Sequence, residues 1–475
     1  MSLLFKGLEP KPVWKHFETI NAIPRASTKE EQIIQYIIDF GNTLKLETTV
    51  DTIGNVIIRK PATLGKENNP IVVLQGHLDM VHQKEVNSIF NFETQGIEML
   101  VDGDWVKAKG TTLGADNGIG VAAIMAVLSS NDIEHPVIEA LFTIDEEVGM
   151  TGAEALKNTQ LSGSILLNLD TEEEDEIIIG CAGGVDVEIE ERLSTEVIDE
   201  SYNFYELKLD RLTGGHSGMD IHLNRANAIK VLAVILSKAE IRITTINSGT
   251  LTNVIPGHGN AIVAVKSTYA IQEVINRIQV ELRNQFSATD AALSISINKV
   301  NARYNVLTKE AQTTFLNALN EIPNGVYSFT EGMPELVQTS NNVAKIKLEN
   351  GIYNIACHTR SSLDAERDEL VAKMNTIFNT AVVKEVGPYP GWKPQPSSNL
   401  LNTAKQCFKE LHSKEAQVKS IHAGLECGIL SGTFPNMEMI SFGPNIRGAH
   451  SPEERLQISS TRRFWEFLKL ILTKI

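Results

Sequence analysis

Histidines and carboxylates follow the apolar runs that read as buried strands, at the point where each run ends. His77 comes after IVVLQG, Glu146 and Glu147 come after VIEALFTI, and Asp170 comes after SILLNL. His450 follows the apolar run MEMISF through the segment GPNIRGAH. Because ligands of open α/β sheets collect at the carboxyl ends of the strands, we expect these side chains to converge on one rim.

Asp116 adds another carboxylate in the segment GTTLGADNG, just before a helix of small apolar residues. Carboxylates at a shared rim would repel one another unless a cation compensated their charge. Two divalent cations balance Asp116, Glu147, Asp170 and one bound hydroxide. His77 and His450 supply neutral imidazoles, which suit zinc, whereas an all-oxygen set would favour magnesium or calcium. We therefore predict two Zn²⁺, with Co²⁺ or Mn²⁺ as possible substitutes.

Each of these motifs alone is weak evidence for a metal site. A single His-x-Asp more often marks a surface turn, and a Glu-Glu pair is usually solvated. The glycine-rich segment around Asp116 lacks the lysine of a P-loop and the spacing GxGxxG, so phosphate binding is not expected. The placement of all the motifs at strand ends is what favours a metal centre.

The elements that must position these residues alternate between strands and helices in the first 180 residues. The β-branched runs 71–75, 137–144 and 164–169 are typical of buried parallel strands. Segment 117–130 predicts a helix packed on the sheet, and 30–40 has the apolar spacing of an amphipathic helix. This alternation predicts an α/β layered domain.

The pattern changes after about residue 184. Runs 185–190, 205–210 and 261–266 alternate apolar and polar residues, as strands of an antiparallel sheet with one wet face do. Helices are expected between these strands at 223–239, 272–287, 309–320 and 364–379. This part therefore reads as an α+β module that is either enlarged or duplicated.

A loop rich in Pro and Gly at 387–399 marks a domain boundary, and a buried-type strand follows it at 437–442. We predict one α/β domain built from residues 1–184 and 391–475, interrupted by an α+β insert at 185–390. Two domains also fit the length of 475 residues, which exceeds what one hydrophobic core usually supports.

Composition limits the partners of the chain. The formal net charge of -16 argues against nucleic acid, which needs a basic surface. No run approaches the roughly 20 apolar residues of a membrane span, and the N-terminus lacks a secretory signal. The four cysteines are scattered without a CxxC pair, which suits reduced thiols in the cytoplasm.

Several motifs together resemble the co-catalytic zinc peptidases, a family that includes carboxypeptidases, acylases and dipeptidases. These motifs are GHLDMV, GADNGIGVA, DEEVGMTGA, LNLD and GAHSPEER. The longer motifs GTTLGADNGIG, TIDEEVGMTGA, GGHSGMDIH and NIRGAHSPEER are similar to the branch of bacterial aminoacyl-histidine dipeptidases, also called cytosol non-specific dipeptidases. The resemblance covers nearly the whole chain. It implies a mixed-sheet di-zinc peptidase domain with helices on both faces, interrupted by an inserted α+β lid domain.

The resemblance also implies a role for each metal ligand. Asp116 would bridge the two cations. His77 and Asp170 would complete the coordination of one cation, and Glu147 with His450 that of the other.

Two further acids match the catalytic positions of the family. Asp79 would orient His77, and its carboxylate, two residues along an extended segment, can accept the free imidazole N–H. Glu146 would be the general base. Adjacent residues of extended backbone point in opposite directions, which would turn Glu146 away from the metals while Glu147 faces them.

Three residues resemble the substrate-binding positions of the family: His216 in GGHSGMDIH, Asn253 in LTNVIPG and Arg360 in CHTRSS. His216 would donate to the oxyanion, either within its own chain or from a partner subunit. A guanidinium is the natural partner of a terminal carboxylate. The competing interpretations are a turn before a helix for His216 and a surface strand position for Arg360. The acidic run 171–176 would be a solvated loop or a partner for the substrate ammonium.

The function implied is a metallo-dipeptidase for dipeptides with a free N-terminus, Xaa-His and broader, which uses a zinc-activated hydroxide. The alternatives are an N-acyl amino-acid deacylase or a tripeptidase on the same scaffold. A non-catalytic binding protein is disfavoured because every expected ligand and the base are present. A homodimer through the insert is a further expectation.

Overall fold

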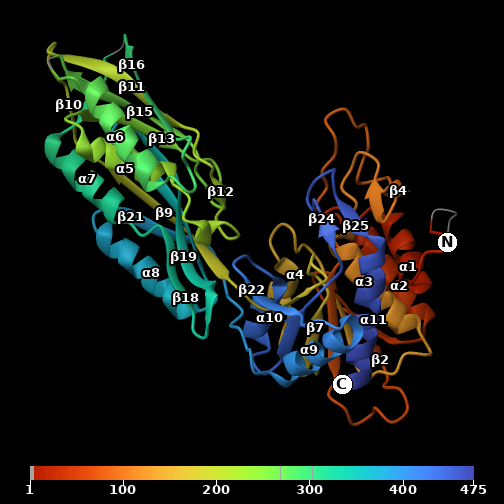
Figure 1. The fold of residues 1–475 in the computed structure, drawn as a ribbon. Helices are drawn as coiled ribbons and strands as arrows, with labels where there is room; N and C mark the ends of the chain where they lie inside the picture. Colours follow the sequence, from red (N-terminus) through yellow and green to blue (C-terminus); the bar gives the residue numbers. More distant parts are fainter. Residues whose placement is uncertain (1–4, 268, 302) are drawn as a thin grey trace. The chain divides into compact units, whose positions relative to one another are not determined.

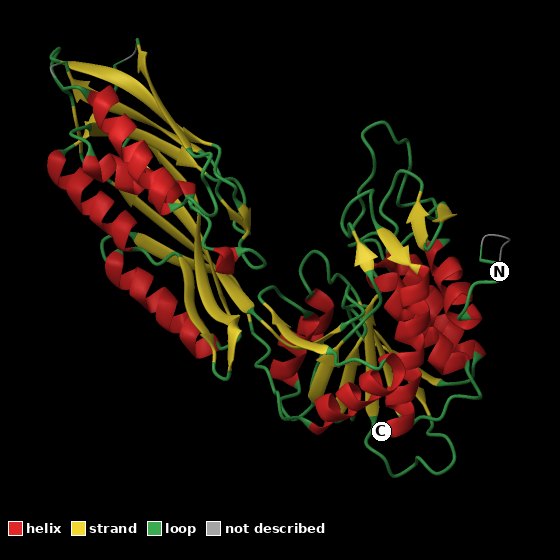
Figure 2. Cartoon of the chain, viewed as in Figure 1, coloured by secondary structure: helices red, strands yellow, loops and turns green. Residues whose placement is uncertain are grey.

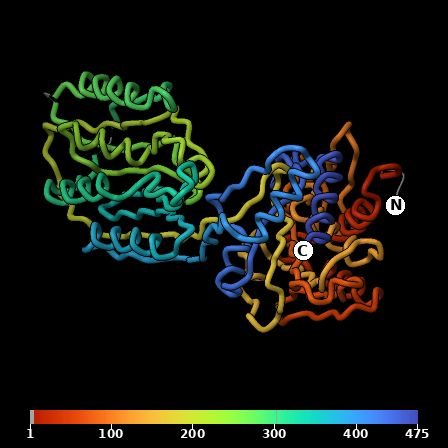
Figure 3. The backbone as a smooth tube through the Cα atoms, turned by 60° about the horizontal axis from the view of Figure 1, so that its bottom comes forward, coloured from red at the N-terminus to blue at the C-terminus, as the bar shows by residue number. Residues whose placement is uncertain are grey.

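Two structural units make up the chain in the computed structural model, which describes residues 5–267, 269–301 and 303–475. Unit 1 comprises Met1–Gly180, Pro394–Ser420 and Leu425–Ile475, and unit 2 comprises Cys181–Lys393 and Ile421–Gly424. The red-orange and blue ends of the chain therefore share unit 1, while green and cyan segments build unit 2 (Figure 3). The sequence-based domain limits of 1–184, 185–390 and 391–475 stay predictions.

Unit 1 contains an eight-stranded sheet whose order is β1-β2-β6-β3-β7-β23-β8-β22. Its central strands β6, β3, β7 and β23 are parallel, as expected for these buried runs, while β2 and β8 pair antiparallel with their neighbours. The sheet is therefore mixed. Its strands are β1 (Glu47–Val50), β2 (Val56–Lys60), β3 (Val72–His77), β6 (Ile138–Thr143), β7 (Ile165–Asn168), β8 (Glu176–Cys181), β22 (Gln417–Ile421) and β23 (Glu438–Ser441).

Helices cover both faces of this sheet. Leu74 and Phe142 belong to a core cluster with α1 (Lys11–Asn21), α2 (Glu31–Thr43), α3 (Ala115–Ser129), α9 (Asn399–His412) and α11 (Ile458–Lys474). Gln75, the residue after Leu74 in β3, faces the other side of the sheet. There it donates to Glu426 of α10 (Glu426–Thr433), and α10 packs on α4 (Thr151–Ala155). Helix α3 lies between α1 and the sheet, which explains why it is apolar on all sides (Figure 1).

A four-stranded sheet, ordered β24-β25-β5-β4, brings the last ligand segment into unit 1. Strands β24 and β25 flank His450, and β25 pairs with β5 upstream of Asp116. The strands are β4 (Met99–Asp102), β5 (Trp105–Ala108), β24 (Ile446–Arg447) and β25 (Arg455–Gln457).

Unit 2 has one continuous nine-stranded sheet, with all its pairings antiparallel. Helices α5 to α8 lie along one face of it (Figure 2). Its strands are β9 (Gly183–Arg192), β11 (Tyr202–Asp210), β13 (Arg242–Ser248), β15 (Gly259–Lys266), β16 (Ser294–Val300), β18 (Gly325–Thr330), β19 (Met333–Glu349), β20 (Ile352–Ser361) and β21 (Val382–Tyr389). Its helices are α5 (Ala228–Lys238), α6 (Ile271–Gln285), α7 (Lys309–Glu321) and α8 (Asp364–Ile377).

Short elements complete unit 2: β10 (Thr195–Glu196), β12 (Gly215–His216), β14 (Val254–Ile255), β17 (Val306–Leu307) and the 3₁₀ helix η1 (Ile221–Leu223). In the described part of the chain, none of the helices has the length and apolarity needed to cross a membrane.

Candidate metal centre

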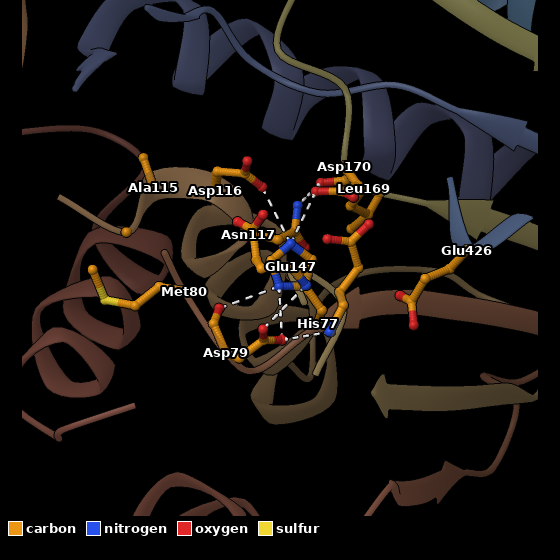
Figure 4. A network of polar contacts seen from close by, with 12 residues as sticks. His77, Asp79, Met80, Ala115, Asp116, Asn117, Glu147, Leu169, Asp170 and Glu426 are labelled. Carbon is orange, nitrogen blue, oxygen red and sulfur yellow. Dashed lines mark hydrogen bonds and ion pairs between the residues drawn. The ribbon is translucent and has the colours of Figure 1, made fainter. Parts of the chain in front are cut away.

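Five side chains predicted as metal ligands come together in unit 1. His77 is the last residue of β3, Asp170 lies just beyond β7, and Glu147 lies in the turn after β6. Asp116 is the second residue of α3, and His450 lies in the loop between β24 and β25. Figure 4 shows Asp116, Asp170 and Glu147 around the His77 imidazole. The convergence expected at the carboxyl ends of the strands is therefore present in the geometry.

Asp116 contacts both histidines, each through a different oxygen. His77 Nε2 lies 3.2 Å from Asp116 Oδ1 and 3.5 Å from Asp170 Oδ1. His450 Nε2 lies 3.2 Å from Asp116 Oδ2 and 3.1 Å from Glu147 Oε2. Within each of these two groups the ligand atoms lie within 4.8 Å of one another, close enough to hold a metal ion. Such an arrangement suits one carboxylate shared between two cations.

The charges around these groups also fit a bound cation. Glu147 Oε1 is buried without a hydrogen-bond partner, so one acceptor of this carboxylate is left unused by the protein. Burial and the neighbouring Asp116 charge raise the pKa of Asp170 well above its usual value, although His77 opposes the shift. A divalent cation would compensate these carboxylates, and nitrogen and oxygen donors together are the set that zinc accepts.

The histidines are surrounded by negative charge. Burial alone would lower the pKa of His77, but Asp170, Asp116 and Asp79 outweigh it and raise that pKa well above 6.5. Hydrogen bonds to Asp116 and Glu147 raise the pKa of His450 to about 11. Burial would raise the pKa of Asp116, yet its contacts with His450 and His77 lower it. Binding of a cation must therefore displace protons from the imidazoles.

Asp79 joins the His77 ring to the turn that carries the two glutamates. Its Oδ1 lies 3.3 Å from His77 Nδ1, and Ser27 Oγ donates to its Oδ2 at 2.8 Å. The backbone N–H groups of Glu146 and Glu147 also donate to its carboxylate, at 3.1 and 3.2 Å. The carboxylate is thus placed to orient both His77 and the turn.

The backbone around Glu146 differs from the expectation. Residues 146–149 form a turn rather than an extended segment, and Asp145 before them has a φ of 55°. The prediction of an extended backbone at Glu146 and Glu147 is therefore wrong. Even so, a carboxylate oxygen of Glu146 lies within 4.8 Å of ligand atoms of His77 and Glu147. Burial, with Asp170, Glu426 and Glu147, raises the pKa of Glu146 well above its usual value.

A buried polar row beneath the ligands was not predicted. Gln75 and Asn168 each lie two residues before a ligand, and Asn168 donates to Gln75. Ser441 donates to Asn168, and Gln75 Nε2 donates to Glu426 at 2.5 Å. Burial raises the pKa of Glu426 to about 7. The available signal was a polar residue inside each apolar run, in IVVLQGH and SILLNLD.

The acidic run 171–176 is mostly paired. Basic side chains bond its last four acids, in the pairs Glu173–Arg447, Glu174–Arg463, Asp175–Lys414 and Glu176–Lys419. Glu172 is the remaining acid of the run, and its surroundings include the metal-centre carboxylates. Burial and the charge of Asp116 raise the pKa of Glu172 to about 7. The run is therefore not a plain solvated loop.

Comparison with known proteins decides the family. A model of peptidase family M20/M25/M40 matches residues 73–474.

The chain belongs to peptidase family M20/M25/M40.

Two relatives combine high identity with coverage of almost the whole chain. The cytosol non-specific dipeptidase of Escherichia coli (strain K12) is 38% identical over an alignment 476 positions long, which covers 98% of this chain and 98% of that protein. The aminoacylhistidine dipeptidase from Vibrio alginolyticus is 37% identical with a TM-score of 0.95, covering 100% of this chain and 98% of that one. A tripeptidase from Staphylococcus aureus shares the fold at a TM-score of 0.58 and 15% identity, covering 98% of each chain.

The substrate-binding residues expected from the family lie in unit 2. His216 is in β12, which pairs with β14, and Asn253 is the exposed residue before β14. His216 Nδ1 accepts the N–H groups of Gly218 and Met219 at 3.2 and 3.1 Å. A neutral His216 ring therefore carries its proton on Nε2, which leaves a donor. Burial and the Arg360 charge lower the pKa of His216, which favours this neutral form.

Arg360 is only 5% exposed, so the interpretation as a surface strand residue is wrong. Its Nη1 donates to the Tyr389 hydroxyl at 3.2 Å, and its Nε is buried without a partner. Two histidines treated as structural from the sequence, His358 and His422, are close enough to Arg360 for its charge to contribute to the lowering of their pKa, after burial. Arg360 therefore keeps a guanidinium donor that unit 2 leaves unpaired.

Proposed function

We propose that this M20/M25/M40 peptidase hydrolyses dipeptides that have a free N-terminus, Xaa-His and broader, with two Zn²⁺ held by unit 1. The observation that carries the proposal is Asp116, whose two oxygens each face a different histidine-containing group. The two relatives that are 38% and 37% identical to the chain over nearly its whole length are both named as dipeptidases. That likeness favours a dipeptidase over an N-acyl amino-acid deacylase or a tripeptidase.

The proposed ligands are Asp116 for both cations, His77 and Asp170 for one, and Glu147 and His450 for the other. When bound, Zn²⁺ lowers the pKa of water and polarises the scissile carbonyl. Side chains of the protein carry out the proton transfer and bind the substrate.

Glu146 is the proposed general base. It accepts a proton from the attacking water and delivers it to the nitrogen of the leaving amine as the C–N bond breaks. A raised pKa suits this residue, because a base that must also act as an acid works best with a pKa near the working pH. Asp79 acts beside it, orienting the His77 ring and the turn on which Glu146 lies.

Residues of unit 2 are proposed to bind the substrate. His216 would donate its Nε2–H to the oxyanion that develops on the carbonyl, and Arg360 would bind the terminal carboxylate of the dipeptide. Asn253 would hold the peptide beside His216. Its carbonyl oxygen accepts the backbone N–H of Ser217, the residue after His216, at 2.8 Å. In this scheme unit 2 is the lid and also the surface for a homodimer, and the protein acts in the cytoplasm, like the E. coli relative named for the cytosol.

One assay tests both the metal and the substrate. Alanyl-histidine, a tripeptide and an acetylated amino acid are offered in parallel, before chelation, after chelation and after zinc is added back. We expect alanyl-histidine to be the preferred substrate and its hydrolysis to be lost on chelation and restored by zinc. Preference for the acetylated compound or the tripeptide would replace the dipeptidase assignment, and activity that survives complete metal removal would refute the zinc mechanism. Light scattering tests the dimer, which a monomeric mass would contradict.

A further inference from the structure

One carboxylate holds the backbone that leads into Asp116. Glu454 is 2% exposed, and four consecutive backbone N–H groups donate to it. Its Oε2 accepts from Leu113 at 2.7 Å and Gly114 at 2.9 Å. Its Oε1 accepts from Ala115 at 2.7 Å and Asp116 at 3.3 Å. Consecutive N–H groups that converge in this way form a nest for an anion, which the protein fills with its own side chain.

Glu454 also belongs to the segment that carries His450. Its N–H donates to Ser451 O at 3.1 Å, closing a turn directly after His450. His450 Nε2 in turn meets Asp116 Oδ2 at 3.2 Å. The two segments that meet at Asp116 are therefore joined twice, once through the ligand side chains and once through Glu454 and the backbone.

Arg25 holds the same loop through its carbonyl groups. Its guanidinium donates to Gly114 O and, at 3.1 and 3.0 Å, to the carbonyl oxygens of Leu78 and Asp79 beyond β3. A Cβ at Gly114 or at Gly118 would lie 2.5 Å from Arg25 Nη2, so both glycines leave room for this side chain. Gly114 also has a φ of 69°, which favours glycine. The Gly114 residue is thus held through its N–H by Glu454 and through its C=O by Arg25.

We propose that Glu454 is a positioning residue for Asp116, fixing the loop 113–116 so that Asp116 Oδ1 faces His77 and Oδ2 faces His450. The inference rests on the proposed function, which assigns Asp116 as the shared ligand. In Glu454→Gln one of the two acceptor oxygens becomes an NH2 donor, which leaves two of the four N–H groups without their acceptor, and the loop then moves to find others. Asp116 would no longer present both oxygens in the required directions, although Glu454 itself touches no cation.

Metal binding to the full-length protein tests this role. Glu454→Gln and Glu454→Asp are compared with the wild type and with Glu453→Gln, which changes the exposed neighbouring glutamate. Metal-free samples are titrated with Co²⁺ and with Zn²⁺ by calorimetry, and the visible spectrum of bound Co²⁺ reports its coordination. Far-UV circular dichroism reports folding.

Wild type and Glu453→Gln should bind two equivalents with the same affinities and the same Co²⁺ spectrum. Natively folded Glu454→Gln should bind at least one cation about 10- to 100-fold more weakly, with a changed Co²⁺ spectrum. Glu454→Asp keeps the charge and should recover part of this loss.

Wild-type affinities and spectrum in Glu454→Gln would overturn the inference while leaving the proposed function intact. Loss of folding in both Glu454 variants would also overturn it, because Glu454 would then serve stability rather than positioning. A wild-type protein that binds no cation would refute the proposed function, and this inference with it.

Discussion

Glu146 and Glu147 are adjacent in sequence, yet they have different surroundings. Glu147 Oε2 lies 3.1 Å from the His450 ring, as a ligand of the same cation would. Glu146 has its pKa raised well above the usual value by burial and by Asp170, Glu426 and Glu147, so it holds a proton more readily. The difference is set by the turn that Asp79 holds through both backbone N–H groups. Identical side chains thus suit the two proposed roles of proton carrier and ligand.

Replacing Glu146 by glutamine should remove proton transfer and keep the shape of the turn. We expect kcat for alanyl-histidine to fall by about 10²- to 10⁴-fold, with the number of bound Zn²⁺ unchanged. Steady-state kinetics and metal analysis of the same sample measure the two effects. Glu154→Gln, at an exposed position of the following helix α4, is the matched control and should keep wild-type kcat. Near-normal turnover in Glu146→Gln would show that another group carries the proton.

The sequence could predict individual metal ligands where the residue type binds metals and the residue directly follows a predicted strand. His77, Glu147 and Asp170 could be predicted to meet for this reason, whereas Asp116, at the start of a helix, and His450, in a loop, were predicted to join them from the motifs GADNG and GAHSPEER. Glu454 could not be predicted, since its partners are backbone N–H groups, which any sequence contains. The backbone at Glu146 was predicted wrongly for a similar reason, because nothing in TIDEEVG indicates a turn with a positive φ at Asp145.

At the scale of elements, the apolar runs predicted their own strands well, because burial on both faces leaves no polar alternation. What they could not show is which strands lie next to each other. The order β6-β3-β7-β23 brings a strand from the end of the chain beside strands from its beginning. Only this order brings Gln75, Asn168 and Ser441 into one hydrogen-bonded row across the sheet.

Asn168 of β7 stands in the middle of the hydrogen-bonded row Gln75–Asn168–Ser441, so its replacement should affect the stability of the protein. Asn168→Leu should lower the free energy of unfolding by about 1–3 kcal/mol, because the buried partners on Gln75 and Ser441 lose their hydrogen bonds. Urea denaturation of the metal-free protein measures the change. Thr49→Leu, at an exposed position of the edge strand β1, should change it by much less. Equal effects of the two substitutions would argue that the row adds no stability.

Helix α1 carries a buried histidine that links packing to pH. Burial, together with Lys15, lowers the pKa of His16 to about 4, and its Nε2 lies 3.2 Å from Ser129 Oγ of α3. The unfolded chain binds a proton near pH 6.5, while the folded protein does so only near pH 4. The free energy of unfolding should therefore fall as the pH drops through this window, by about 3 kcal/mol from this residue.

Urea denaturation at pH 7, 5.5 and 4 tests the assignment to His16. His16→Gln should lose stability less steeply over this range than the wild type. His222→Gln, at an exposed residue of η1, should follow the wild type. If His16→Gln kept the full wild-type slope, the pH dependence would have to come from other groups.

At the scale of the whole molecule, each unit has its own large hydrophobic core. The core of unit 1 draws on residues from both ends of the chain, whereas the buried residues described for the main core of unit 2 run from Val185 to Phe378. All five proposed metal ligands lie in unit 1. A cation that binds the folded state should therefore stabilise unit 1 directly and leave the stability of unit 2 unchanged.

Calorimetry of the full-length protein should show two unfolding transitions, of which only one responds to zinc. At a free Zn²⁺ concentration 100 times the dissociation constant, the unfolding free energy of unit 1 should rise by about 2.7 kcal/mol for one site. Fluorescence assigns the transitions, because Trp392 belongs to unit 2 and the other tryptophans, Trp14, Trp105 and Trp465, belong to unit 1. In Trp392→Phe, fluorescence follows unit 1 alone and should move with zinc like the responsive transition. An equal zinc shift of both transitions would mean that the units unfold as one, and no shift of either would place the cations outside the folded centre described above.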